Sequence, residues 1–177
     1  MIVFRRAPAP YPFQWESGQE QPPGRWHGED EGPAQYFADT PDGAWAEFLR
    51  HEYITDPEDL AGLRETLWAV ELPDDLNLAA PDLPMATLTG GEESYAACRQ
   101  EARRLRASSP RGLRAPSAAL LPSGARGWRV QSGLRDGPPR DGRVIVLFGT
   151  QPEVLGWRAC AEGRPDELLL RKVRQLR

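Results

Sequence analysis

The sequence predicts a single compact α+β domain in which a central mixed β-sheet is flanked by short helices. Apolar runs of strand length occur at residues 66–72 and 143–149, and the second, RVIVLFG, suits a buried central strand. Helical spacing of apolar residues is confined to short segments, chiefly 41–53 and 92–107. The 18 prolines and 17 glycines indicate many loops and short elements.

The length and composition are those of an ordinary globular protein. A chain of 177 residues with 40% hydrophobic and 27% charged residues is expected to form one domain spanning residues 1–177. Its net charge of −4 argues against binding to nucleic acid or to an anionic membrane surface. No stretch reaches the roughly 18 apolar residues of a membrane span. The start, MIVFRRAPAP, is too short an apolar run for a signal peptide, so we expect a cytoplasmic protein.

Several common kinds of site have no support in the sequence. The two cysteines, Cys98 and Cys160, lie far apart and belong to no paired motif, so we expect separate reduced thiols and no metal site. No P-loop, GxGxxG fingerprint or internal repeat is present. Nucleotide binding through those motifs is therefore not indicated.

The first elements in the chain are expected to be two strands separated by a long loop. Residues 1–4 form a short apolar run, interpreted as an edge strand, that leads into Arg5 and Arg6 before a proline-rich stretch. Residues 13–33 are rich in glycine, proline and acidic side chains and predict an irregular loop. Residues 35–38 form a brief apolar and aromatic strand.

A helix is expected directly after that strand, because DTPD at residues 39–42 supplies an N-cap candidate and a proline for the first helical position. Trp45, Phe48 and Leu49 then share one helical face and form its packing stripe. Glu47 lies about 160° from Trp45, at roughly 100° per residue. The pattern by itself therefore makes Glu47 a solvated surface acid.

The later elements follow from the same patterns. In order, we expect a short helix at 60–65, a strand at 66–72, a proline-punctuated loop at 73–84, a helix at 92–107, a strand from 112 to Ser117, a strand at 143–149, a strand-like run at 154–160 and a basic helix at 166–176. The helix at 92–107 carries four arginines away from its apolar face, interpreted as a solvated surface: Arg99, Arg103, Arg104 and Arg106.

Two polar residues stand out in their local setting. Arg25 follows Gly24 in the long loop, where a planar guanidinium can bind a phosphate through two parallel hydrogen bonds. A surface salt bridge with an acid at residues 29–31 is the alternative. Ser117 follows a proline that restricts the approach of the backbone, and a turn serine is its alternative. No GxSxG elbow surrounds Ser117, so we do not interpret it as an acyl-transfer nucleophile.

Three motifs in order resemble the N-terminal half of the RES-domain family, which supplies the toxins of RES–Xre toxin–antitoxin pairs. They are GRWH at 24–27, YFA at 36–38 and AWAE at 44–47. The steps from Arg25 to Tyr36 and from Tyr36 to Glu47 are both 11 residues (36 − 25 and 47 − 36), the spacing associated with the family. Further resemblance lies in FR at 4–5 and PSA at 116–118. The chain departs from the family at His27 and Arg143, where relatives usually have asparagine.

This resemblance implies an ADP-ribosyltransferase-like fold and the degradation of NAD⁺ by phosphorolysis or hydrolysis of the nicotinamide–ribose bond. Glu47 would stabilise the ribosyl cation that forms as nicotinamide leaves. Arg25 and Arg5, or Arg6 in the next register, would neutralise the pyrophosphate or hold inorganic phosphate as a co-substrate. NAD⁺ is the substrate in this reaction, so neither a cofactor nor a metal is expected.

The same resemblance implies roles for three further side chains. Tyr36 would stack on a flat ring or hydrogen-bond through its hydroxyl. Ser117 would orient nicotinamide or a phosphate oxygen. His27 would donate a hydrogen bond, with a surface histidine as the alternative.

The family also implies a partner, an Xre-type helix-turn-helix antitoxin that covers the active site. No DNA-binding segment is visible in this chain, so no direct contact with nucleic acid is expected. Two other functions stay open: a protein ADP-ribosyltransferase that uses the same cleft, and a catalytically silent protein that binds a nucleotide or a partner. Water, phosphate and a protein side chain all stay open as the acceptor.

Overall fold

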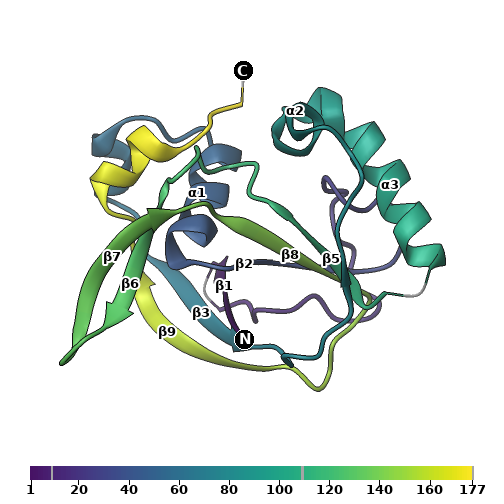
Figure 1. Ribbon diagram of the computed structural model, residues 1–177, viewed down its shortest axis with the longest axis horizontal. Coiled ribbons are helices and arrows are strands. Elements are labelled where there is room, and N and C mark those ends of the chain that lie inside the picture. The colour runs from purple at the N-terminus through teal and green to yellow at the C-terminus, as the bar shows by residue number, and fades with distance from the viewer. Residues whose placement is uncertain (9, 109, 177) are drawn as a thin grey trace.

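A seven-stranded sheet forms the centre of the protein, and the helices lie on one side of it (Figure 1). The computed structural model describes residues 1–8, 10–108 and 110–176. The sheet contains, in spatial order, β4 (Leu78–Ala79), β5 (Gly112–Pro116), β8 (Arg143–Phe148), β2 (Ala34–Ala38), β1 (Ile2–Ala7), β3 (Glu65–Glu71) and β9 (Leu155–Gly163). A separate two-stranded ribbon consists of β6 (Ala125–Val130) and β7 (Leu134–Arg140). The helices are α1 (Pro41–His51), α2 (Met85–Thr89) and α3 (Tyr95–Ala107), with 3-10 helices η1 (Pro57–Leu60), η2 (Glu92–Ser94) and η3 (Glu167–Lys172).

The sheet is mixed, as predicted, and the α+β class is confirmed. Only the pairing of β4 with β5 is parallel among its neighbouring strands, and the other pairs are antiparallel. Strand β8 lies between β5 and β2 and is buried on both faces. Val144 and Val146 pack on the helical side, whereas Ile145 and Leu147 pack on the opposite side. This two-sided burial explains the continuous apolar run.

Strand β1 was predicted at an edge, and this prediction is wrong. β1 lies between β2 and β3 and extends to Ala7, so that Arg5 and Arg6 lie within the strand rather than beyond its end. The two arginines pair in register with Trp68 and Leu67 of β3. Charged residues are tolerated in a central strand here because their side chains reach a cavity described below. The strand ends immediately before Pro8, which lacks the N–H needed to continue the ladder.

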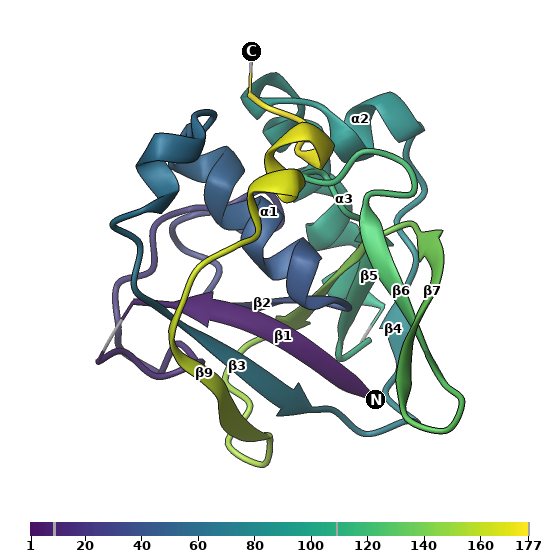
Figure 2. The same ribbon diagram turned by 90° about the vertical axis from the view of Figure 1, so that its left-hand side faces the viewer.

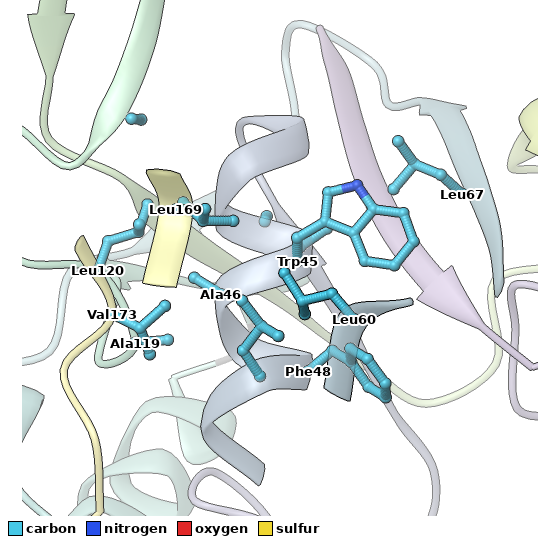
Figure 3. Packing of buried hydrophobic residues seen from close by; sticks show 13 residues of the cluster. Trp45, Ala46, Phe48, Leu60, Leu67, Ala119, Leu120, Leu169 and Val173 are labelled. Carbon is cyan, nitrogen blue, oxygen red and sulfur yellow. The ribbon is translucent and has the colours of Figure 1, made fainter. Parts of the chain in front are cut away.

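The predicted passage from strand to helix is confirmed between β2 and α1. The Thr40 side chain caps the helix by accepting a hydrogen bond from the Gly43 amide at 2.9 Å, and Pro41 occupies the first turn. Trp45, Phe48 and Leu49 are buried, as their spacing predicts. Figure 3 shows this face of α1 packed against side chains from η1, η3 and the turn after β5.

Three buried clusters hold the sheet and its coverings together. One packs α1 against β1, β2 and the C-terminal segment, and a second packs α3 against β5 and β8. The third lies on the opposite face of the sheet, where loop side chains such as Phe13 and Val154 cover Val3, Phe37 and Val70. Figure 2 shows α1 lying across the sheet between η3 and the strands. The helix that carries Glu47 is therefore anchored along its whole packing face.

The arginine face of α3 was predicted to be solvated, and this is wrong for Arg99 and Arg106, whereas Arg103 and Arg104 are exposed as predicted. The Arg99 Nε donates to the Gly24 carbonyl at 2.8 Å, and the Arg106 Nη1 donates to the Glu31 carbonyl at 2.7 Å. Arg103 pairs with the Glu31 carboxylate at 2.5 Å. Charge runs are usually solvated, but here the long loop after β1 folds back onto the helix. These contacts from α3 hold residues 24–31, the segment that contains Arg25, in place.

Other parts of the chain differ from prediction because tertiary packing selected shorter elements. The expected helix at 60–65 is replaced by η1, capped by the Asp56 side chain, and the C-terminal helix is reduced to η3. The ribbon β6–β7 and the short helix α2 were not predicted, since proline and glycine interrupt the apolar pattern in both regions. No helix in the described part of the chain is both long and apolar enough to cross a membrane.

Candidate active site

A cavity of about 600 Å³ opens beside α1, where β1, β2 and the long N-terminal loop meet. Five of the six predicted site residues line it, and they come from four separate segments: Arg5, Arg25, His27, Tyr36 and Glu47. Aromatic side chains of the wall include Trp15, Trp26 and Phe48. The cavity is therefore largely apolar, with a few charged groups directed into it.

Glu47 lies on the face of α1 that turns away from the packing stripe, as the helical spacing predicts. That face borders the cavity as well as solvent, so the side chain is only 31% exposed. The Ser117 hydroxyl donates to Glu47 Oε1 at 3.4 Å, and His51 Nε2 lies 3.9 Å from Oε2. The interpretation of Glu47 as a plain surface acid is therefore wrong. A helical wheel cannot distinguish a face toward solvent from one toward a cavity.

Ser117 is the one predicted residue that does not line this cavity. It follows β5, is buried, and borders a smaller cavity of about 420 Å³ on the other side of Pro116. Its hydroxyl oxygen accepts hydrogen bonds from the amides of Ala119 and Leu120 at 3.2 and 3.1 Å. Ser117 is thus a turn serine, which was the alternative to a role in the substrate pocket. Its hydroxyl proton is directed to Glu47.

Arg25 is buried, and most of its hydrogen-bonding capacity is used within the protein. Nη1 donates to Ser94 Oγ at 2.7 Å and to the Thr87 carbonyl at 3.3 Å, and Nη2 donates to the Gly90 carbonyl at 2.7 Å. The guanidinium also lies 4.7 Å from the ring centre of Tyr95. These contacts leave Nε and one N–H of Nη2 for an anion in the cavity. The alternative interpretation, a salt bridge with the acids at 29–31, is wrong because Arg25 donates to the acceptors just named, and Glu31 pairs with arginines of α3 instead.

Between the two N-terminal arginines, the surroundings favour Arg5 as the anion contact. Arg6 pairs with Glu65 at 3.4 Å and lies 4.1 Å above the Phe48 ring, so its charge is already neutralised. Arg5 has no carboxylate partner among the described residues, and its nearest polar contact is Gln35 Oε1 at 3.4 Å. Burial and the neighbouring Arg6 lower the pKa of Arg5 to about 10. The Arg5 side chain thus keeps its charge at neutral pH.

His27 and Tyr36 form a buried pair at one end of the cavity. The Tyr36 hydroxyl accepts a hydrogen bond from the Trp26 amide and lies 2.9 Å from His27 Nδ1. Burial raises the pKa of Tyr36, so the phenol stays protonated and its proton is available to His27 Nδ1. His27 is only 2% exposed, so the alternative of a surface histidine is wrong. Its Nε2 has no hydrogen-bond partner among the residues that the structure describes.

His27→Gln is expected to reduce the slope of the unfolding free energy against pH. Burial and the positive charge of Arg106 lower the pKa of His27 in the native protein. Between the native pKa and the unfolded pKa of roughly 6.5, the unfolded chain therefore binds a proton at His27 that the native protein does not. The free energy of unfolding is unaffected by His27 above the unfolded pKa, and it decreases as the pH falls from there toward the native pKa. Urea unfolding at several pH values measures this slope.

The matched control is His51→Gln, because His51 is exposed on the last turn of α1. We expect that variant to keep the slope of the parent protein. A His27→Gln variant with the slope of the parent would contradict the lowered pKa of His27.

Arg143, the other departure from the family motifs, lies away from the large cavity. It begins β8, pairs in register with Pro116, and has an exposed side chain beside the smaller cavity. Its amide donates to Asp39 Oδ1 at 2.8 Å, which fixes the corner between β2 and α1. Among the described residues, no three His, Cys, Asp or Glu side chains gather as metal ligands.

A model of the RES domain matches residues 2–158 of the chain. The chain belongs to the RES-domain family. A chain of the crystal structure of the M. tuberculosis MbcT–MbcA toxin–antitoxin complex shares its fold, with a TM-score of 0.59 and 15% sequence identity. That alignment covers 96% of this chain and 86% of the other chain. No curated protein matches the sequence.

The sequence motifs of the RES domain did not reveal two arginines close to Glu47. Arg50 lies one turn further along α1 and is 2% exposed, and Arg174 follows η3. Both donate to the carbonyl of Ala118, beside Ser117. The helical spacing gives no signal for Arg50, because at roughly 100° per residue it lies about 140° from Trp45 and outside the packing stripe. No local signal marks Arg174 either.

Proposed function

We propose that this RES domain is the toxin of a toxin–antitoxin pair and that it degrades NAD⁺ in the cytoplasm. The observation that carries the proposal is the placement of Glu47 in one cavity with Arg5 and Arg25. NAD⁺ carries a positive charge on its nicotinamide ring and negative charges on its pyrophosphate. One ligand can therefore pair with Glu47 through its nicotinamide end and with Arg5 and Arg25 through its pyrophosphate. The cavity of about 600 Å³ lies within the usual size range of small-molecule sites.

The reaction breaks the bond between the nicotinamide nitrogen and C1′ of the ribose. Neutral nicotinamide leaves with the bonding electron pair, and C1′ becomes an oxocarbenium-like cation. The Glu47 carboxylate stabilises this charge, while the Ser117 hydroxyl holds Oε1 in place. Attack by water then yields ADP-ribose and a proton, whereas attack by inorganic phosphate yields ADP-ribose phosphorylated at C1′. No general acid is needed, because nicotinamide is a good leaving group.

The remaining wall residues fit binding better than proton transfer. The Tyr36 hydroxyl is already engaged by the Trp26 amide and His27, so Tyr36 offers its ring for stacking on a flat group. Arg5 provides a charge without a carboxylate partner in the described chain, which suits the pyrophosphate or a phosphate co-substrate. The apolar side chains of the wall lower the local dielectric constant, which strengthens these charge contacts.

The test is loss of NAD⁺ in the presence of the purified protein, with and without inorganic phosphate, followed by separation of the products. Acceleration by phosphate with a phosphorylated product identifies a phosphorylase, and phosphate-independent ADP-ribose identifies a glycohydrolase. Absence of NAD⁺ loss in both conditions contradicts the proposal. In that case, labelled ADP-ribose on a protein would identify a protein ADP-ribosyltransferase, and NAD⁺ binding without turnover would identify a silent binding protein.

We also propose that the partner is an Xre-type helix-turn-helix antitoxin that covers the cavity. The fold shared with a chain of the MbcT–MbcA toxin–antitoxin complex supports an antitoxin as the partner, and the motif resemblance to RES–Xre pairs is what suggests the Xre type. Expression of the RES domain with a candidate antitoxin encoded beside it should yield a complex that co-elutes in size-exclusion chromatography. Separate elution of the two purified proteins would contradict the pairing without affecting the assay for NAD⁺.

A further inference from the structure

We propose that Arg174 is a positioning residue, which acts together with Arg50 to hold the Ser117 turn against Glu47. The inference rests on the proposed function of the cavity that Glu47 lines. Arg174 lies beyond residues 2–158, the part of the chain matched by the RES-domain model. The C-terminal segment would thus complete a site that otherwise comes from the first two thirds of the chain.

Arg50 connects three segments of the site. It lies three residues after Glu47 on α1, where its guanidinium is almost completely buried. Nη1 donates to the Ala118 carbonyl and Nη2 donates to the Gly90 carbonyl at 2.6 Å. The Gly90 carbonyl also accepts from Arg25. Arg50 therefore ties the helix of Glu47 both to the turn of Ser117 and to the loop that holds Arg25.

Arg174 secures the same turn from the other side. Its Nη1 donates to the carbonyls of Ala118 and Ser117 at 2.9 and 3.4 Å, and its backbone amide donates to the Ala119 carbonyl at 2.7 Å. Val173 forms an isolated β-bridge with Leu120 directly beside this contact. Figure 2 shows the C-terminal segment passing beside α1 on its way to the end of the chain. The turn is thus held between α1 and the C-terminal segment.

This arrangement determines the direction of the Ser117 hydroxyl. The amides of Ala119 and Leu120 occupy its oxygen, so its proton can reach only one side, where Glu47 Oε1 lies at 3.4 Å. The positive charges of Arg50 and Arg174 also attract the Glu47 carboxylate toward the Ser117 turn. Burial lowers the pKa of both arginines, and Glu47 is the largest opposing influence on each.

The experiment compares Arg174→Met, Arg174→Lys and the control Arg171→Met in the full chain. Arg171 is an exposed arginine of the same segment, so its replacement changes the charge equally without touching the Ser117 turn. We expect Arg174→Met to lower kcat for NAD⁺ loss about tenfold with little change in KM. Arg174→Lys should restore part of the loss, and Arg171→Met should match the parent protein.

A double-mutant cycle separates positioning from general support of the fold. If Arg174 acts through Ser117, Arg174→Met should have little further effect on kcat in a Ser117→Ala background. Equal effects in the two backgrounds would overturn the proposal. So would an unchanged kcat in Arg174→Met alone.

Amide hydrogen exchange tests the structural step without any activity. We expect the amides of Ala119 and Leu120 to exchange faster in Arg174→Met than in Arg171→Met, because both amides donate to Ser117 Oγ within the turn. Equal exchange rates would overturn the positioning role even in an active enzyme. If the parent protein does not consume NAD⁺, the proposed function fails, and this exchange comparison still decides whether Arg174 holds the turn.

Discussion

Glu47→Gln is expected to lower kcat for NAD⁺ loss by roughly a hundredfold to a thousandfold, the range found when one charge-stabilising group is removed from an active site. Glutamine has the size of glutamate but no negative charge. The variant can still accept a hydrogen bond from Ser117, so the geometry of the turn should persist. What it loses is the stabilisation of the ribosyl cation, which exists only as nicotinamide leaves.

The stability of the Glu47→Gln variant should be close to that of the parent protein. Glu47 is partly exposed, its only ion pair in the described chain is a weak one with His51 at 3.9 Å, and Arg50 and Arg174 keep their carbonyl acceptors when its charge is removed. The urea midpoint and the rate of NAD⁺ loss should therefore respond very differently to this single change. Substrate affinity should change less than kcat, because the ground state makes less use of the carboxylate.

Glu58→Gln is the matched control for this prediction. Glu58 lies in η1, is exposed and does not line the cavity, so the same loss of charge should leave NAD⁺ loss unchanged. Turnover by Glu47→Gln at the rate of the parent protein would exclude the role assigned to Glu47. A fall of equal size in Glu58→Gln would indicate a general effect of net charge instead.

Arg25→Met is expected to lower the free energy of unfolding by about 3 kcal/mol, the largest stability effect we predict. The methionine side chain fills part of the space but donates no hydrogen bond. Ser94 Oγ and the Thr87 carbonyl would lose their charged donor in a buried setting, and the Gly90 carbonyl would keep only Arg50. The cation–π contact with Tyr95 would be lost as well.

Urea denaturation of Arg25→Met and Arg103→Met measures this difference. Arg103 has the same side chain but is 59% exposed, and its ion pair with Glu31 belongs to a class that contributes about 1 kcal/mol or less. We expect Arg103→Met to unfold close to the midpoint of the parent protein. An Arg25→Met variant as stable as Arg103→Met would show that the buried contacts of Arg25 do not support the fold.

Local pattern was sufficient for several elements of the RES domain. The N-cap and proline at residues 40–41 predicted the start of α1, because a cap is satisfied within a few residues of itself. The apolar run of β8 predicted a central strand, since only a strand covered on both faces can bury such a run. The motif residues Arg25, Tyr36 and Glu47 line one cavity, whereas Ser117, which was expected beside them, borders a second cavity.

Local pattern failed where distant segments decide the surroundings of a residue. Arg99 and Arg106 of α3 appeared solvated because the chain that covers them, residues 24–31, lies far away in sequence. Strand β1 appeared to be an edge because Arg5 and Arg6 follow its apolar residues, yet both reach the cavity from a central strand. A surface position was the alternative for His27, and it is wrong because the fold buries this residue beside Tyr36.

The sequence by itself determined the α+β class, the boundary between β2 and α1, and the family to which the chain is similar. These properties depend on capping, apolar periodicity and short motifs, which act over a few residues. Only the tertiary structure decided that Arg25 is largely occupied by protein acceptors, that Glu47 borders a cavity, and that Arg174 reaches the Ser117 turn. Hydrogen bonds and burial across such separations depend on how the sheet brings segments together, and no local pattern encodes that arrangement.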